Sequence, residues 1–224
     1  MDEQKRQYLS TIEIFQDLTT GEVEKIDQSV TMTTCRPGKI FYTPEETGEV
    51  LFLLKKGTVQ LYRLSPEGRK LVVATLGKGS MFGEMSLIGQ GMHNLFAEAV
   101  TDCLLCVMSR VDLERLIQEK PRVGLRFMES MATRLQNAES QLEDLAFKSI
   151  SARLADILLQ RAEQKENQLA LTGYTHQDLA ELLGTYRETI TLTLNELKAD
   201  GIIAIGRKHI TILNREALES IQRS

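Results

Sequence analysis

The stretch from Pro121 to about Phe147 most constrains how this chain can fold. It has no interior proline, and its only glycine, Gly124, lies near its start. Apolar residues recur in it at alternating intervals of three and four: Met128, Met131, Leu135, Ala138, Leu142 and Leu145. Two interleaved seven-residue repeats over about three heptads are typical of a long helix that pairs with another helix. The stretch therefore predicts a long helix with a dimer seam.

The same apolar stripe has a second interpretation, because most amphipathic helices lie on the core of their own domain. A core-facing helix usually shows a wider apolar face than two residues per heptad. The flanks of this stripe are polar: Glu129, Arg134, Gln136, Glu139, Gln141 and Glu143. The narrow stripe favours a seam between two copies of the chain.

The residues before this helix read as short strands separated by glycine and proline. The segments 49–54, 58–63 and 70–76 are rich in β-branched and aromatic residues, and glycines or Pro-Glu-Gly turns bound them. Strands at this spacing predict a compact antiparallel barrel or roll. Ahead of them, residues 9–30 have helical character, with Thr20 as the expected N-cap.

The residues after the long helix predict short helices and a final pair of strands. Helices are expected over 151–164, 175–183 and 185–199, strands over 168–172, 202–205 and 209–213, and a last helix capped by Asn214. The whole chain is thus expected to be α+β.

The segment from Thr175 to Thr191 fits a helix-turn-helix. Ala180 is small enough for the point where two helices cross, and Gly184 tolerates the positive φ of the turn. Inner apolar anchors are supplied by Leu179, Leu183, Ile190 and Leu194. Polar side chains from Thr185 to Thr189 remain to face outward at the start of the second helix, where a recognition helix meets base edges.

An ordinary pair of packed helices with solvated charges would show much of the same pattern. The downstream hairpin distinguishes the two interpretations, because its turn carries Gly206, Arg207 and Lys208. A basic hairpin beside a recognition helix is well placed to contact phosphates. Together, the two features indicate a winged helix-turn-helix.

Over nearly its whole length the sequence resembles the cyclic-AMP receptor protein and fumarate-nitrate regulator (CRP/FNR) superfamily of bacterial transcription regulators. The resemblance is carried by the roll pattern from Arg36 to Leu87, by the long helix with the following Ala152-Arg-Leu-Ala, and by Arg187-Glu-Thr-Ile-Thr. It implies a cyclic-nucleotide-binding-like β-roll, a homodimer held by the long helix, and a DNA-binding C-terminal domain.

The resemblance and the wing together give a set of expected DNA-binding residues: Thr175, His176, Gln177, Tyr186, Arg187, Glu188, Thr189, Leu192, Arg207 and Lys208. Leu192 departs from the family pattern, since the best-known member has a second base-reading arginine there. Leucine can contact a thymine methyl group instead. We therefore expect a palindromic operator that is related to that member's site but altered.

The roll matches only half of the family's cyclic-nucleotide pattern. Gly83 and Glu84 stand where a glutamate takes the ribose hydroxyl, but His93 and Asn94 stand where an arginine and a serine take the phosphate. No lysine or arginine occurs between Lys78 and Arg110, so the phosphate would lack a charge-assisted contact. Cyclic AMP is therefore disfavoured. The expected effector pocket comprises Gly83, Glu84, Met85, Ser86, His93, Asn94, Arg134 and Glu139.

Other sensing chemistries find little support. An iron–sulfur cluster needs four cysteines, and the chain has three: Cys35, Cys103 and Cys106. Cys103 and Cys106 lie three apart on an expected strand and so point to opposite faces; buried, inert thiols are the favoured interpretation. A haem sensor needs an axial histidine or cysteine, for which His93 or Cys35 can be proposed, but nothing in the sequence specifies haem. Arg134 with Glu139 suits either an oxo-acid site or solvated helix flanks. No effector is identified by the sequence, and DNA binding without any ligand is a further alternative.

Composition sets the remaining expectations. No apolar run is long enough to span a bilayer, and the charged N-terminus lacks a signal-peptide pattern, so a cytoplasmic location is expected. The net charge of −4 arises from residues 1–146, with 17 basic and 21 acidic residues, while residues 147–224 hold ten of each. Local placement of basic residues governs phosphate contacts, so this balance does not argue against DNA.

The chain is thus expected to contain a β-roll sensor domain (1–122), a central dimerisation helix (123–147) and a winged helix-turn-helix domain (148–224). Its expected partners are double-stranded DNA, a second copy of itself and RNA polymerase, with no membrane and no metal. Catalytic motifs such as a phosphate loop or a nucleophile elbow are absent from the sequence, so no enzymatic activity is expected. The alternative is a cyclic-nucleotide-binding-like effector module whose winged helix docks protein. The sequence leaves the choice between activation and repression open.

Overall fold

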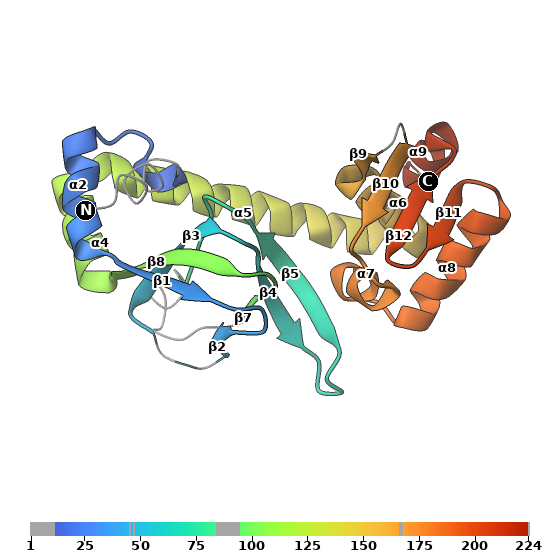
Figure 1. Cartoon of the computed structure of the whole chain (residues 1–224), viewed down its shortest axis with the longest axis horizontal. Helices are drawn as coiled ribbons and strands as arrows, with labels where there is room; N and C mark the ends of the chain where they lie inside the picture. The colour runs from blue at the N-terminus through green and yellow to red at the C-terminus, as the bar shows by residue number, and fades with distance from the viewer. Residues whose placement is uncertain (1–11, 45, 47, 84–94, 166–167, 224) are drawn as a thin grey trace. The chain divides into compact units, whose positions relative to one another are not determined.

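A computed structural model describes the chain except for residues 1–11, 45, 47, 84–94, 166–167 and 224. Internal contacts divide the chain into two compact units (Figure 1). One unit comprises residues 1–63 and 73–136, and the other comprises residues 64–72 and 137–224.

The N-terminal part is an antiparallel roll of two four-stranded sheets, ordered β1-β8-β3-β6 and β2-β7-β4-β5. The strands are β1 (Thr31–Cys35), β2 (Ile40–Tyr42), β3 (Val50–Lys56), β4 (Val59–Leu64), β5 (Lys70–Leu76), β6 (Met81–Phe82), β7 (Phe96–Ala99) and β8 (Cys103–Ser109). The three strands predicted from the sequence lie within one residue or two of β3, β4 and β5. In β3 the residues Leu53, Leu54 and Lys55 are buried in succession, because both faces of this strand are covered.

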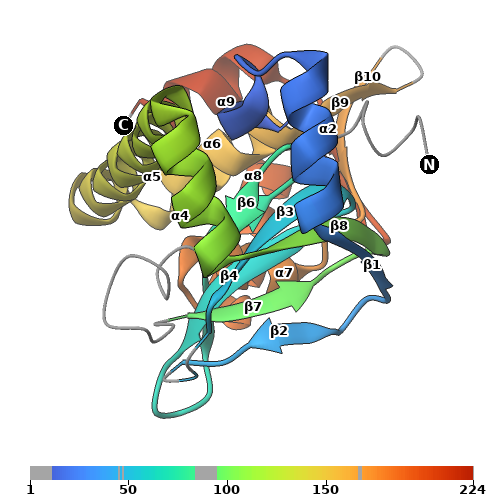
Figure 2. The same ribbon diagram turned by 90° about the vertical axis from the view of Figure 1, so that its left-hand side faces the viewer.

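Two apolar clusters hold this roll together. The first lies between the sheets and includes Leu54, Val59, Phe82 and Leu105. The second covers the outer face of the β1-β8-β3-β6 sheet with η1 (Glu13–Phe15), α2 (Thr20–Ser29), α4 (Arg110–Glu119) and the start of α5 (Pro121–Phe147) (Figure 2). Leu51, Leu53 and Met108 face these helices.

The N-terminal helical stretch differs from the prediction in two respects: residues 16–19 interrupt it between η1 and α2, and the N-cap of α2 lies one residue earlier. This N-cap is Thr19 rather than Thr20, because the Glu22 carboxylate accepts bonds from the Thr19 amide (2.8 Å) and hydroxyl (2.9 Å). This capping box selects the threonine three residues before a glutamate. Residues 9–11 of the predicted helical stretch lie outside the described residues.

The long helix α5 runs from Pro121 to Phe147, as predicted. Val123 and Phe127 are buried in the N-terminal core, and Met131 packs beside them. Beyond Met131 the apolar side chains are exposed, and Leu142 keeps 67% of its accessible surface. The described residues hold no helix that is long and apolar enough to cross a membrane.

The C-terminal part combines four helices with one antiparallel sheet, ordered β11-β12-β10-β9. Its elements are α6 (Ile150–Arg161), β9 (Glu163–Lys165), β10 (Gln168–Thr172), α7 (His176–Leu183), α8 (Arg187–Ala199), β11 (Ile203–Gly206), β12 (His209–Ile212) and α9 (Arg215–Gln222). The prediction of a helix up to residue 164 was wrong, because Glu163–Lys165 pairs with β10 as a strand. Asn214 caps α9 as predicted, accepting a bond from the Ala217 amide at 3.0 Å.

One apolar cluster unites these C-terminal elements. Its fully buried centre is formed by Leu154 and Leu158 of α6, Leu179 of α7, and Ile190 and Leu194 of α8. Every member of the cluster lies between residues 150 and 221. This part of the chain therefore has a complete core of its own.

Candidate DNA-binding surface

The first helix of the helix-turn-helix, α7, has a reciprocal cap at its N-terminus. The Thr175 amide and hydroxyl donate to an Asp178 carboxylate oxygen at 2.7 and 2.8 Å, and the Asp178 amide donates to the Thr175 hydroxyl at 3.1 Å. Such a box satisfies amides that a helix start leaves unpaired. Thr175, predicted as a DNA contact, thus also fixes where a short helix begins.

The turn between α7 and α8 has the backbone that the sequence predicts. Gly184 is left-handed, with φ 63° and ψ 35°, and Ala180 is buried where the helices cross. The amide of Thr185 donates to the Ala180 carbonyl at 3.0 Å, which closes the turn. A side chain at Gly184 would add the strain that non-glycine residues suffer in this region.

The second helix, α8, begins later than predicted, at Arg187 with Tyr186 as its N-cap. Thr185 belongs to the turn, because the chain needs extended backbone after Gly184 before it can enter the helix. Tyr186, Arg187, Glu188 and Leu192 are exposed, with Tyr186 at 63% and Leu192 at 65%. Thr189 is half-buried. The start of α8 therefore presents one cation, one carboxylate and one large apolar side chain outward.

A hydrogen-bond chain that the sequence analysis missed connects the two helices. His176 Nδ1 lies 2.9 Å from Thr191 Oγ1, and this hydroxyl donates to the carbonyl of Arg187 at 2.9 Å. Because the hydroxyl proton is used on Arg187, the Nδ1 atom must be the donor to Thr191. The only sequence signal for this chain is a threonine four residues after Arg187, which can bond back to that carbonyl.

The C-terminus of α7 is held by Arg153, a second residue that the sequence analysis did not identify. Its Nη1 atom donates to the Leu183 carbonyl at 2.9 Å. Loss of solvent around this half-buried guanidinium lowers the pKa of Arg153 from its ordinary value. The bond satisfies a carbonyl that the end of a helix leaves open, and it ties α6 to the turn.

The β11–β12 hairpin has Arg207 and Lys208 at its turn, both exposed. Lys208 is left-handed, with φ 51°, an uncommon conformation for a residue with a long side chain. Gly206 pairs with His209, so the two basic residues form the turn between the paired strands. The basic wing has the place and the charge that the sequence predicts.

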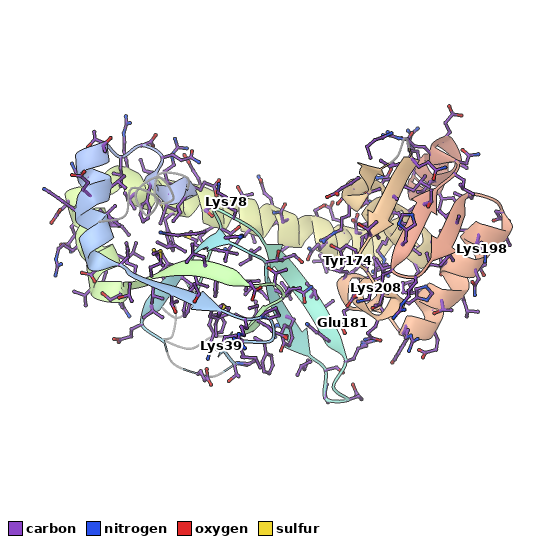
Figure 3. The ribbon with its side chains drawn as sticks, in the orientation of Figure 1. Lys39, Lys78, Tyr174, Glu181, Lys198 and Lys208 are labelled. Carbon is purple, nitrogen blue, oxygen red and sulfur yellow. The ribbon has the colours of Figure 1, made fainter. Side chains whose placement is uncertain are left out.

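A groove of about 490 Å³ brings most of the predicted residues together. Among the predicted set it is lined by Thr175, His176, Gln177, Arg187, Arg207 and Lys208. Figure 3 labels Lys208 at the wing and Tyr174 in the segment before α7, and both side chains line this groove. Tyr186, Glu188, Thr189 and Leu192 are not among its lining residues. Arg187 thus lines the groove and is flanked on α8 by the exposed Tyr186 and Glu188.

The predicted effector pocket is described only in part, because Glu84, Met85, Ser86, His93 and Asn94 lie outside the described residues. Gly83 has φ 92°, and a Cβ atom there would lie 2.8 Å from the Val50 carbonyl oxygen. Packing thus explains this glycine without a ligand. Arg134 donates to the backbone carbonyl of Met81, beside Gly83, whereas Glu139 is exposed.

The three cysteines are free thiols. Cys103 and Cys106 pack into different apolar clusters, so they lie on opposite faces of β8 as predicted. Cys35 is half-buried rather than fully buried. Throughout the described part of the chain, histidine, cysteine and carboxylate side chains form no group of three or more that could hold a metal ion.

A helix-turn-helix followed by a basic hairpin, together with an antiparallel roll and a long helix, defines a winged-helix DNA-binding protein with a separate β-roll. Residues 32–120 match the cyclic nucleotide-binding domain, and residues 152–221 match the Crp-like helix-turn-helix domain. The chain is 33% identical over 184 residues to the cyclic AMP receptor protein of Thermus thermophilus, covering 82% of this chain and 84% of that protein. This chain therefore belongs to the CRP/FNR family.

Two further relatives extend the comparison. The global nitrogen regulator of Synechococcus elongatus is 29% identical over 217 residues, covering 93% of this chain and 95% of that protein. A crystal structure of a CRP/FNR-family transcriptional regulator from Eubacterium rectale has a TM-score of 0.79 at 27% identity, covering 96% of this chain and all of that one. The chain is accordingly a DNA-binding transcription regulator, as its relatives are, and not an enzyme.

Proposed function

We propose that this regulator is a homodimer that reads a palindromic operator through the exposed side chains at the start of α8. The observation that carries this proposal is the placement of Arg187 between the outward face of α8 and the groove that the basic wing also lines. Two such helices would enter successive major grooves about 34 Å apart.

The exposed residues of α8 have distinct chemical roles in this proposal. Arg187 pairs bidentately with guanine, and Glu188 accepts a bond from the amino group of cytosine. Leu192 offers an apolar surface to a thymine methyl group. Tyr186 and Thr189 support these contacts at the edges of the face. The operator is therefore expected to contain a guanine that Arg187 reads and a cytosine that Glu188 reads, with a thymine near Leu192.

The remaining predicted residues position the protein on the phosphate backbone. Arg207 and Lys208 contribute charge from the wing, and Thr175, His176 and Gln177 contribute polar groups from the N-terminus of α7. Contacts of this type set register and affinity without reading sequence.

The dimer seam is assigned to the exposed apolar residues of α5. CRP-like regulators act as dimers, and Met128, Leu135, Leu142 and Leu145 are all exposed in the single chain. Ala138 is exposed beside them, whereas Met131 packs mainly on the N-terminal core. Association along these residues would remove their apolar surface from water.

We further propose that cyclic AMP is not the effector. Several relatives are named for this nucleotide, but this chain has no lysine or arginine between Lys78 and Arg110 to meet a phosphate, and packing accounts for Gly83. Any effector would act through α5 and the two non-helical residues, Lys148 and Ser149, that separate it from α6, by shifting the population of dimers with correctly spaced helices. In this proposal the regulator works in the cytoplasm and contacts RNA polymerase.

Selection of sites from a random DNA pool by the purified, ligand-free protein tests the proposal. We expect a palindrome whose half-sites lie about one helical turn apart. An Arg187→Ala variant should lose about 1–3 kcal/mol on that site and relax specificity at one base pair. The matched control is Arg215→Ala on α9, which removes the same charge away from the groove. Equal behaviour of both variants, or a site without symmetry, would contradict the assignment.

Cyclic AMP is then added at increasing concentration to the selected operator complex. The proposal predicts no change in affinity, whereas tightening in proportion to nucleotide occupancy would overturn the effector part alone. If the ligand-free protein selects no site, the selection is repeated with cell extract. A site recovered only with extract would show that DNA binding requires an effector.

A further inference from the structure

Cys35 and Cys103 lie directly opposite each other on neighbouring strands. Cys35 is the last residue of β1, Cys103 is the first residue of β8, and they are partners in the antiparallel register of the two strands. Figures 1 and 2 show β1 and β8 running side by side in the roll.

The register places both thiols on one face of the sheet, because opposed residues of an antiparallel pair share a face. Cys103 belongs to the apolar cluster between the sheets, and Cys35 packs against the same cluster. Cys106 faces the other cluster. Cys106 is therefore unable to reach Cys35 without breaking the strand.

The spacing suits a covalent bond between Cys35 and Cys103. Directly opposed residues in antiparallel strands have Cα atoms about 4.5–5.5 Å apart, and disulfides span Cα distances of about 4.4–6.8 Å. The two side chains already interact. Burial first, and then the neighbouring Cys103 thiol, raise the pKa of Cys35 from its ordinary value.

The two thiols differ in their surroundings: Cys103 is buried and contacts backbone carbonyls, whereas Cys35 is partly exposed. The Cys103 thiol lies 3.3 Å from the Thr101 carbonyl and 3.5 Å from the Thr58 carbonyl. A Cβ atom on Gly57 would lie only 2.7 Å from the Cys103 sulfur, so the backbone closes over it on that side. Cys35 is half-buried and is the member of the pair that solvent can reach.

We propose that Cys35 and Cys103 are a redox modification site that closes to an intramolecular disulfide when a hydroperoxide is present. Because the pKa of Cys35 is raised, only a minor fraction of the thiol is ionised at neutral pH, and oxidation is expected to be slow there and faster at alkaline pH. That thiolate attacks a peroxide oxygen to form an S–O bond, the O–O bond breaks, and Cys35 becomes a sulfenic acid while one equivalent of alcohol or water leaves. The Cys103 sulfur then attacks the Cys35 sulfur, the S–O bond breaks, and water leaves. Two thiols are oxidised by two electrons, and one hydroperoxide is reduced.

The bond would join β1 to β8 and so fix the start of the roll to its last strand. In a reducing compartment the two thiols stay separate, and the bond forms only under oxidant. This inference does not depend on the DNA-binding proposal, since it concerns the roll alone.

The test treats the full-length protein with hydrogen peroxide, blocks remaining thiols with N-ethylmaleimide, and digests it with trypsin without reductant. Cys35 lies in the tryptic peptide 26–39, because trypsin does not cut before Pro37, whereas Cys103 and Cys106 share the peptide 79–110. The Cys106→Ala variant removes the ambiguity. We expect it to give a crosslink between these two peptides in a single chain, with the loss of two hydrogen atoms and reversal by dithiothreitol.

Cys35→Ser is the negative control. Cys35 is half-buried, so this change should leave the roll folded, whereas a change at the buried Cys103 would disturb the core. Cys35→Ser should give no linked peptide, and it should leave Cys103 and Cys106 as thiols after the same treatment. The inference is overturned if oxidised Cys106→Ala protein shows no link, if Cys35 links one chain to another, or if it accumulates as a sulfinic or sulfonic acid.

Discussion

The basic wing offers the sharpest quantitative test of how this protein holds DNA. We consider the double variant Arg207→Gln, Lys208→Asn, which removes both charges from the turn. Lys208 is left-handed at φ 51°, and asparagine tolerates this conformation better than most residues. The change therefore removes charge while it keeps the hairpin.

The magnitude follows from counting phosphate contacts. Each neutralised phosphate contributes about 0.9 to the slope of log affinity against log salt. Two wing residues in each of two protomers give about four contacts, so the slope should become less steep by about 3.6. Between 50 and 200 mM salt, the wild type should lose roughly a hundredfold more affinity than the variant.

Fluorescence anisotropy on the selected operator, over several potassium chloride concentrations, measures this slope. The control is Arg215→Gln, since Arg215 is exposed on α9, pairs with Glu219 and does not line the groove. An unchanged slope in the wing variant, or an equal change in the Arg215 control, would refute the assignment of the wing to phosphate contacts. A change in base preference would instead place the wing at base edges.

Four further outcomes are expected. Leu192→Ala should weaken operator binding by up to about 1–2 kcal/mol per half-site, since about two thirds of a leucine remains to be buried; competition with operators carrying uracil for thymine checks this, and equal competition by both operators would contradict it. Gly57→Ala should cost about 2–4 kcal/mol in chemical denaturation, because φ is +96° and a Cβ would lie 2.4 Å from the Asp102 carbonyl oxygen. Leu135→Glu should give monomers in sedimentation, because a charge would enter the proposed seam; a stable dimer would exclude Leu135 from it. The Lys120 ammonium and the Thr19 cap lower the pKa of Glu22 to about 2 from 4.5. The contribution of the Glu22 carboxylate to the free energy of unfolding should therefore be complete above about pH 5 and fade toward pH 2. Glu22→Gln should flatten this part of the curve of stability against pH, and an unchanged curve would show that the carboxylate does not stabilise the fold.

Much of the architecture was accessible from local sequence patterns. The bounds of α5 follow from Pro121 and an uninterrupted helical pattern, and the left-handed turn follows from Gly184. Strands β3, β4 and β5 follow from β-branched runs between turn residues. In each case the element is determined by residues close together in the sequence, so a short window of sequence is enough to predict it.

The remaining features depend on partners distant in sequence. The strand Glu163–Lys165 is polar and has no alternation of its own, and it forms because β10 supplies its hydrogen bonds. Periodicity placed Met131 on the seam but could not show that the N-terminal core would cover it. The opposition of Cys35 and Cys103 is likewise a matter of strand register, which no short window of sequence specifies.

The C-terminal cluster, built entirely from residues 150–221, has a consequence for how such a protein can change over time. Residues 64–72 belong to the same compact unit as α7 and α8 and contact them, as in the Lys70–Glu181 ion pair. Substitutions elsewhere in the roll, and with them any response to a signal, need no compensating change in the packing beneath α7 and α8. Conversely, in the proposed mode of DNA binding, a change at an exposed position such as Leu192 would alter the preferred operator without touching that packing. The stimulus and the set of regulated genes can therefore diverge separately within one lineage.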